Sequence, residues 1–172
     1  SDIWIVASDQ EEPTANPRRV TTNEGSDRSP AWSPDGRSLT YTTGIRPDLI
    51  WYATTHLAVI SIDGGEPHLL TTDLDRNVSQ PRFSDDGDWI WFRLEDSAEN
   101  HVARIRPSGE DLERPISGSF SAGAFDWAGG TFAVSVSYLD HPGEIYRMTG
   151  AERGSGDLSR VTGHNDDFLS KV

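Results

Sequence analysis

The sequence predicts an all-β fold made of repeated antiparallel sheets, and three observations support this. Short apolar and β-branched runs alternate with turn residues, and the 172 residues include 16 Gly and 10 Pro. No long amphipathic helix pattern is visible. One hairpin pattern recurs about every 45 to 50 residues, which is typical of propeller blades. We therefore predict a partial β-propeller of about three and a half four-stranded antiparallel blades.

Each repeat contains an inner hairpin with an aromatic residue before its turn. In the stretch 30–43 the turn carries Asp35-Gly36, and in the stretch 80–94 it carries Asp86-Gly87. Asp-Gly between two strand-like runs is a strong hairpin signal, because glycine tolerates the positive φ that the turn requires. The third copy, 125–137, has the shorter turn Ala128-Gly129-Gly130. We expect these residues to be structural turns.

An outer pair of strands recurs in phase with the hairpin. The expected pairs are 2–7 with 18–21, 57–62 with 68–71, 101–105 with 112–116, and 144–148 with 158–162. The second pair is joined by Asp63-Gly64-Gly65, so Gly64 and Gly65 are also expected to be turn residues. The polar stretch 8–17 reads as a loop.

These repeats predict a propeller segment over residues 1–163. It begins with a half blade at 1–21, continues with blades at about 30–72, 80–117 and 123–162, and is followed by a trailing segment at 164–172. One such sheet cannot bury both faces, so neighbouring blades stack, and we expect the large aromatics Trp32, Phe83 and Trp127 to fill the space between them. The alternative, a β-sandwich with a coincidental repeat, is disfavoured because hairpin and outer pair recur in phase.

Composition excludes several classes of function. A formal net charge of −13, with 28 acidic and 15 basic residues, argues against a nucleic-acid partner. No apolar run is long enough to span a membrane. The absence of cysteine excludes disulfides and thiol chemistry. No signal-peptide pattern opens the chain, but Ser1 is not a natural initiator, so removal of a leader stays open.

Three segments carry a resemblance to known families. The repeat Trp32-Ser33-Pro34-Asp35-Gly36 and its outer half at 62–71 resemble the repeat of TolB-type propellers and of the non-catalytic domain of prolyl oligopeptidase-family serine peptidases. The tail 161–169, Val-Thr-Gly-His-Asn-Asp-Asp-Phe-Leu, resembles the Leu-Thr-x-His-Asn segment by which acylaminoacyl-peptidase-like members leave the propeller for the hydrolase domain.

The peptidase resemblance implies a non-catalytic propeller that gates the active site and selects short peptides. The Ser-Asp-His chemistry would belong to an α/β-hydrolase domain of the same polypeptide, absent from this chain, toward which 164–172 would lead. The alternative is a TolB-type propeller that serves as a protein–protein interaction scaffold with no attached enzyme. The first reading favours the cytoplasm and the second the periplasm. In either case the open edges of a partial propeller could pair with a second copy.

We expect no catalytic residue in this chain. The nearest approach to a Gly-x-Ser-x-Gly nucleophile elbow is 118–123, where the spacing around Ser121 is wrong. Asp85, Asp86 and Asp88 form an acidic cluster, but they occupy a hairpin turn where Asp is ordinary. The five histidines show no metal-ligand spacing, so neither a metal nor another cofactor is expected.

The stretch 44–56 is an insertion within the second blade. It contains Trp51 and Tyr52 in an irregular segment. Aromatic side chains on such a loop are candidates for contact with a ligand or with a partner domain. The alternative is that both simply pack down onto the propeller.

Overall fold

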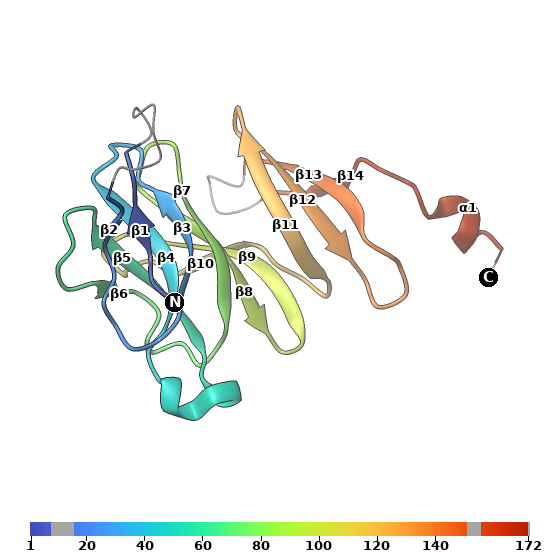
Figure 1. Ribbon diagram of the computed structural model, residues 1–172. Helices are drawn as coiled ribbons and strands as arrows, with labels where there is room; N and C mark the ends of the chain where they lie inside the picture. The colour runs from blue at the N-terminus through green and yellow to red at the C-terminus, as the bar shows by residue number, and fades with distance from the viewer. Residues whose placement is uncertain (8–15, 151–155, 172) are drawn as a thin grey trace. The chain divides into compact units, whose positions relative to one another are not determined.

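The computed structural model describes residues 1–7, 16–150 and 156–171, and they form two compact units (Figure 1). Unit 1 comprises Ser1–Phe92 and Ile105–Glu110, and unit 2 comprises Arg93–Arg104 and Asp111–Val172. Strands β8 (Ile90–Asp96) and β9 (Glu99–Ile105) each contribute residues to both units. Almost all regular structure in the described ranges is β-strand, which confirms the predicted all-β class.

Unit 1 contains the half blade and one complete blade. Strand β1 (Trp4–Ile5) pairs antiparallel with β2 (Arg18–Arg19). The complete blade is an antiparallel meander of β3 (Asp27–Trp32), β4 (Ser38–Gly44), β5 (Thr55–Ser61) and β6 (His68–Leu69), in sequence order. Strand β7 (Val78–Phe83) and the first residues of β8 complete the unit.

One apolar core joins the half blade to the complete blade. Ile3 and Val20 flank the β1–β2 pair, and they pack against residues of β4 and β5. Its fully or nearly fully buried members are Ile3, Val20, Leu39, Tyr41, Ala58 and Ile60. Two sheets that each need cover for one face thus bury that face against each other, as adjacent propeller blades do.

Unit 2 is built from two further sets of strands. Strand β10 (Glu113–Ile116) pairs antiparallel with β9, and β11 (Ser121–Ala128) follows β9 in parallel through the pair Ser121–Asn100. Strands β11, β12 (Thr131–Ser137), β13 (Glu144–Thr149) and β14 (Leu158–Arg160) form a second antiparallel meander. A one-turn helix, α1 (Asp166–Leu169), follows the last strand (Figure 1).

The two Asp-Gly turns have the same hydrogen bonds. In the first, the carboxylate of Asp35 accepts hydrogen bonds from the Ser33 hydroxyl at 2.6 Å and from the Arg37 backbone N–H at 3.0 Å. The second repeats the pattern around Asp86, with 2.6 and 3.0 Å. Gly36 and Gly87 have φ of 68° and 77°, the left-handed region that favours glycine. The acidic cluster around Asp86 therefore takes part in turn structure.

The three aromatic residues expected to fill the space between blades, Trp32, Phe83 and Trp127, are not the main buried residues there. Trp32 is 53% exposed, and Phe83 and Trp127 are only half-buried. Trp32 ends β3, which lies at the margin of its four-stranded sheet, so a neighbour covers it on one side only. Other aromatic side chains, among them Tyr41 and Phe92, are fully buried instead, so the prediction was wrong for Trp32, while Phe83 and Trp127 are partly buried.

The insertion contains the short 3₁₀ segment η1 (Pro47–Tyr52), which is interrupted by non-helical dihedral angles at Ile50. Strand β5 begins at Thr55, before the predicted end of the insertion at 56. Pro47 favours this helix start because its fixed φ suits the first helical position. Among the described residues, the helices are too short and too polar to cross a membrane. The loop expected at 8–17 lies mostly outside the described residues.

Candidate functional site

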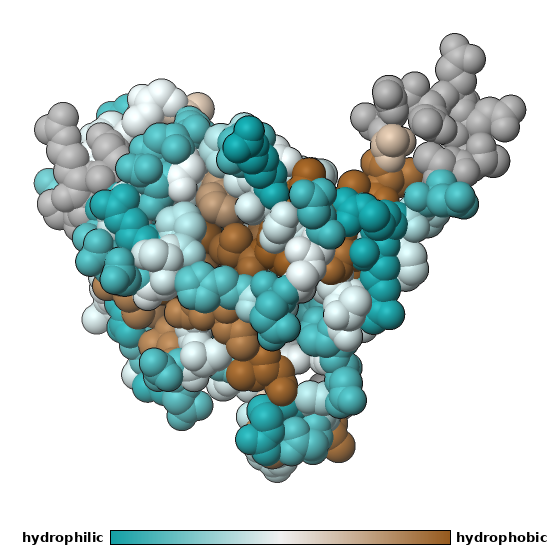
Figure 2. Space-filling view, turned by 90° about the vertical axis from the view of Figure 1, so that its left-hand side faces the viewer, coloured by the Kyte–Doolittle hydropathy of each residue, from teal (hydrophilic) through white to brown (hydrophobic). Residues whose placement is uncertain are grey.

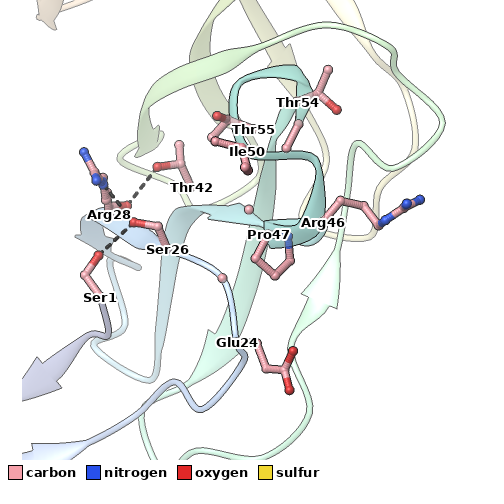
Figure 3. A pocket seen from close by; sticks show the side chains of 13 residues that line it. Ser1, Glu24, Ser26, Arg28, Thr42, Arg46, Pro47, Ile50, Thr54 and Thr55 are labelled. Carbon is pink, nitrogen blue, oxygen red and sulfur yellow. Dashed lines mark hydrogen bonds between the residues drawn. The ribbon is translucent and has the colours of Figure 1, made fainter.

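A pocket of about 570 Å³ lies beside the insertion, on unit 1 (Figure 3). Its walls come from the turn that precedes β3, from β3 and β4, and from the segment that carries η1 into β5. Its lining includes Glu24, Arg28, Thr42, Pro47, Ile50, Ala53, Thr54 and Thr55. Its volume lies within the range of small-molecule sites, about 300–1,000 Å³.

The pocket has a hydrogen-bonded polar wall. The Arg28 Nε donates to the Ser26 hydroxyl at 2.9 Å, and the Ser26 and Ser1 hydroxyls lie 2.8 Å apart. The buried Thr42 hydroxyl donates to the Arg28 backbone carbonyl at 3.1 Å. These bonds fix the backbone carbonyl and the side-chain Nε of Arg28 beside the pocket (Figure 3).

The insertion is braced by an ion pair at its start. Arg46 donates two hydrogen bonds to the Asp48 carboxylate, at 2.9 and 2.8 Å. This bonding raises the pKa of Arg46 and lowers the pKa of Asp48. The charge of Arg46 is therefore compensated within η1.

Ile50 combines an unfavourable backbone with an exposed apolar side chain. Its φ of 49° and ψ of −103° are rare for any residue and strained for a β-branched one. The residue is 73% exposed and lines the pocket. Figure 2 shows polar and apolar atoms mixed on the η1 segment, which forms the lowest part of that view. Strain of this kind is often kept at sites that bind ligands.

Of the two aromatic candidates, the structure places only Tyr52 relative to the pocket. Tyr52 ends η1, is 89% exposed and is not a lining residue. Trp51 lies in η1, but its side chain falls outside the description. Sequence analysis singled out neither Arg28 nor Ile50, which both line the pocket. The only sequence signal of Ile50 is its position in the insertion after Pro47.

The remaining candidate residues hold ordinary structural positions. Gly64 and Gly65 have φ of 87° and 109°, and the Gly64 N–H donates to the Ser61 carbonyl at 2.9 Å, as in a turn. The Ser121 hydroxyl lies in β11 and accepts a hydrogen bond from Asn100 at 3.0 Å. Across the residues that the structure describes, no group of three His, Cys, Asp or Glu side chains could hold a metal ion.

A second polar site joins the trailing segment to the last blade. The Glu144 carboxylate accepts hydrogen bonds from the Asn165 backbone N–H at 3.0 Å, from the Asn165 side chain at 2.9 Å and from the Thr162 hydroxyl. The Thr162 hydroxyl bond, with those from Asn165, lowers the pKa of Glu144 to about 2. Arg160 forms an ion pair with Asp166 at the start of α1. The segment is thus attached to β13 and β14 by several polar contacts.

Two curated relatives match the sequence, and no protein-family model does. An uncharacterized protein of Agrobacterium fabrum, Atu1656, is 33% identical over 123 residues, which cover 66% of this chain and 38% of that protein. The uncharacterized peptidase YuxL of Bacillus subtilis is 28% identical over 160 residues, which cover 91% of this chain and 23% of that protein. The chain thus spans well under half the length of either relative.

Solved structures share the fold. A TolB-like protein of Agrobacterium tumefaciens superimposes with a TM-score of 0.65 at 25% identity, covering 84% of this chain and 51% of that one. The propeller domain of the Trilobed protease of Pyrococcus furiosus gives 0.68 at 16% identity, covering 99% and 46%. An acylaminoacyl peptidase of Pyrococcus horikoshii gives 0.68 at 14% identity, covering 99% and 24%. At these lower identities the likeness concerns the fold alone.

Proposed function

Because the chain has the β-propeller fold of TolB and of prolyl oligopeptidase-family peptidases, we propose that it is the gating portion of a serine peptidase. In this proposal the propeller limits access to a hydrolase domain of the same polypeptide and admits short peptides. The observation that carries it is the match to the Bacillus peptidase, which runs through 91% of this chain but only 23% of that protein.

Two features of the chain support a role in access rather than in chemistry. The Ser121 hydroxyl is bonded to an amide and not to a histidine, so it lacks the general base that a serine nucleophile needs. The segment after β14 is held to the last blade through Glu144, which suits a chain that continues into a further domain. In the proposal, the catalytic serine, aspartate and histidine are supplied by that domain.

The coding sequence beyond Val172 provides the first test. We expect a Gly-x-Ser-x-Gly elbow on a strand–turn–helix, followed in sequence by an aspartate and a histidine. A stop codon shortly after Val172 would contradict the peptidase proposal.

The gating role is tested on the full-length protein with substrates of increasing length. We expect measurable kcat/KM for chromogenic acylated amino acids and dipeptides, and a steep loss for peptides of about 30 residues. The variant with alanine at the elbow serine is the control for contaminating peptidases. Equal kcat/KM for short and long substrates would leave the propeller without a gating role.

A second candidate function is a TolB-type interaction scaffold. It is favoured by the 25% identity to the TolB-like structure, which is higher than the 16% and 14% identities to the two peptidase structures. The scaffold proposal expects no hydrolase domain beyond Val172, so the same reading of the gene distinguishes the two.

A further inference from the structure

We propose that the pocket beside η1 binds the carboxylate end of a short peptide or acylated amino acid, with Arg28 as its anion-binding group. The proposal deepens the gating function, on which its biological meaning rests, by assigning a ligand class to one part of the propeller. The binding itself requires no hydrolase activity and is measured separately from it.

Arg28 is the cation that the pocket leaves available. Its Nε is bonded to Ser26, and within residues 1–7, 16–150 and 156–171 its two terminal nitrogens have no protein partner. The neighbouring Arg46 is already paired with Asp48. A guanidinium presents its N–H groups in a planar fork that matches a carboxylate, so Arg28 can donate to both carboxylate oxygens.

The wall formed by the insertion supplies the complementary apolar contact. Pro47, Ile50 and Ala53 line the pocket with apolar groups, and Ile50 exposes most of its surface although it is apolar. Covering this side chain with an apolar ligand side chain removes both surfaces from water. The Thr55 hydroxyl lies on the same wall and can bond the ligand's amide groups, whereas the Thr54 hydroxyl is already bonded to the His56 ring Nε2 at 3.1 Å.

Glu24 limits the negative charge of a ligand that the pocket can accept. Figure 3 shows its carboxylate well apart from Arg28, so apart from Arg46, which is paired with Asp48, the pocket is lined by one arginine and, elsewhere, one carboxylate. The chain also has a formal net charge of −13, which repels polyanions. The arrangement therefore favours a monoanion with an apolar side chain over phosphate or an acidic peptide.

The strained backbone of Ile50 is a second, independent observation at the same place. A β-branched residue in this conformation persists only where its surroundings fix it, and such residues concentrate at ligand clamps. The Arg46–Asp48 pair lies at the start of the same segment, just before Ile50.

The test compares two ligands that differ only in charge. N-acetyl-leucine carries a carboxylate and N-acetyl-leucinamide does not, and neither contains a second amino acid to be released. Binding to the full-length protein with alanine at its elbow serine is followed by calorimetry. We expect the acid to bind at least about tenfold more tightly than the amide, as a charge-assisted hydrogen bond implies.

Variants locate the binding. Arg28→Gln should weaken acid binding about tenfold or more and leave amide binding unchanged, and Glu24→Gln should strengthen acid binding. Arg37→Gln is the matched control, because Arg37 is an exposed arginine in the first Asp-Gly turn and does not line the pocket. Circular dichroism melting checks that each variant is folded.

Two results would overturn the proposal. One is equal binding of acid and amide by the parent protein, which includes the case where neither binds. The other is an Arg28→Gln variant that binds the acid as the Arg37→Gln variant does. If the full-length protein with its own elbow serine hydrolyses no peptide while this binding is intact, the result counts against the gating proposal alone.

Discussion

The second and fourth blades end in the same backbone arrangement but use it differently. After β6, the Thr71 hydroxyl accepts a hydrogen bond from the Leu57 backbone N–H at 2.9 Å. After β14, the Thr162 hydroxyl accepts one from the Ile145 N–H, also at 2.9 Å. In both blades, the hydroxyl of the threonine after the outer strand thus accepts a hydrogen bond from a backbone N–H near the start of the third strand.

The residue that precedes this bonded N–H in the third strand differs between the two blades. In the second blade it is His56, whose ring Nδ1 bonds the Thr71 carbonyl at 2.9 Å in a buried position. In the fourth it is Glu144, which is 7% exposed and bonds Thr162 and Asn165. Histidine binds the threonine backbone where the chain proceeds to another hairpin. Glutamate bonds Thr162 and Asn165 where the chain leaves the sheet. The residue type at this repeated position thus determines which part of the chain is attached to the third strand.

The largest expected difference lies in the two threonines. Thr71→Val keeps the side-chain shape but leaves the buried Leu57 N–H without its acceptor. Thr71 is only 3% exposed, so water cannot replace the hydroxyl. We expect the free energy of unfolding to fall by about 1–3 kcal/mol, measured by urea denaturation of the full-length protein.

Thr162→Val is the matched variant for that comparison. This variant also removes the hydroxyl's bond to Glu144, but Thr162 is half-buried and water can reach the Ile145 N–H, so we expect a smaller loss than for Thr71→Val. Equal losses in the two variants would show that burial does not distinguish the two blade ends.

Lowering the pH should weaken the end of the fourth blade, because the charge of Glu144 is lost there. The pKa of Glu144 falls from the ordinary 4.5 to about 2 in the folded chain, so its carboxylate stabilises the fold above pH 4.5. That contribution declines as the pH falls below 4.5 and is lost as it passes through about 2. We expect the Glu144 carboxyl resonance to titrate near pH 2, and amide exchange within 163–171, corrected for intrinsic rates, to rise over the same window.

Glu144→Gln is the control for the acid experiment, because a glutamine does not titrate there. Protection of 163–171 in this variant should change less with pH between 4.5 and 2 than in the parent, and the change that is left reports on other carboxylates, such as Asp166 in its ion pair with Arg160. A Glu144 carboxyl that titrates at its ordinary value would mean that the bonds to Thr162 and Asn165 do not persist in solution.

The smallest effect is expected at Asn165. Asn165→Ala removes the side-chain bond to Glu144 but keeps the backbone bond, so we expect global stability to change by less than about 0.5 kcal/mol. Amide exchange at 163–171 should nevertheless accelerate. Ser170→Ala is the control, since its hydroxyl bonds the Asp167 carbonyl and not Glu144. Identical exchange in both variants would exclude a role for the Asn165 side chain.

Local features of the fold could be predicted from sequence, and longer-range ones were predicted less well. The Asp35-Gly36 and Asp86-Gly87 turns are encoded within a few residues, because side-chain bonds and positive φ act locally. Burial of Trp32 was predicted wrongly, because its exposure depends on the place of β3 at the margin of its sheet. An aromatic residue before a turn indicates a strand, but it does not indicate which side has a neighbour.

The sequence by itself determined the all-β class, the repeat and the turns, since each follows from the spacing of residues close together in the chain. Only the tertiary structure decided that Ile50 and not Tyr52 lines the pocket, and that Arg46 has a carboxylate partner while Arg28 has none among the residues that the structure describes. It also decided that Glu144 meets Asn165, 21 residues further on. The physical reason is that strand register and loop conformation place such groups, and both are set by packing across the sheets rather than by local pattern.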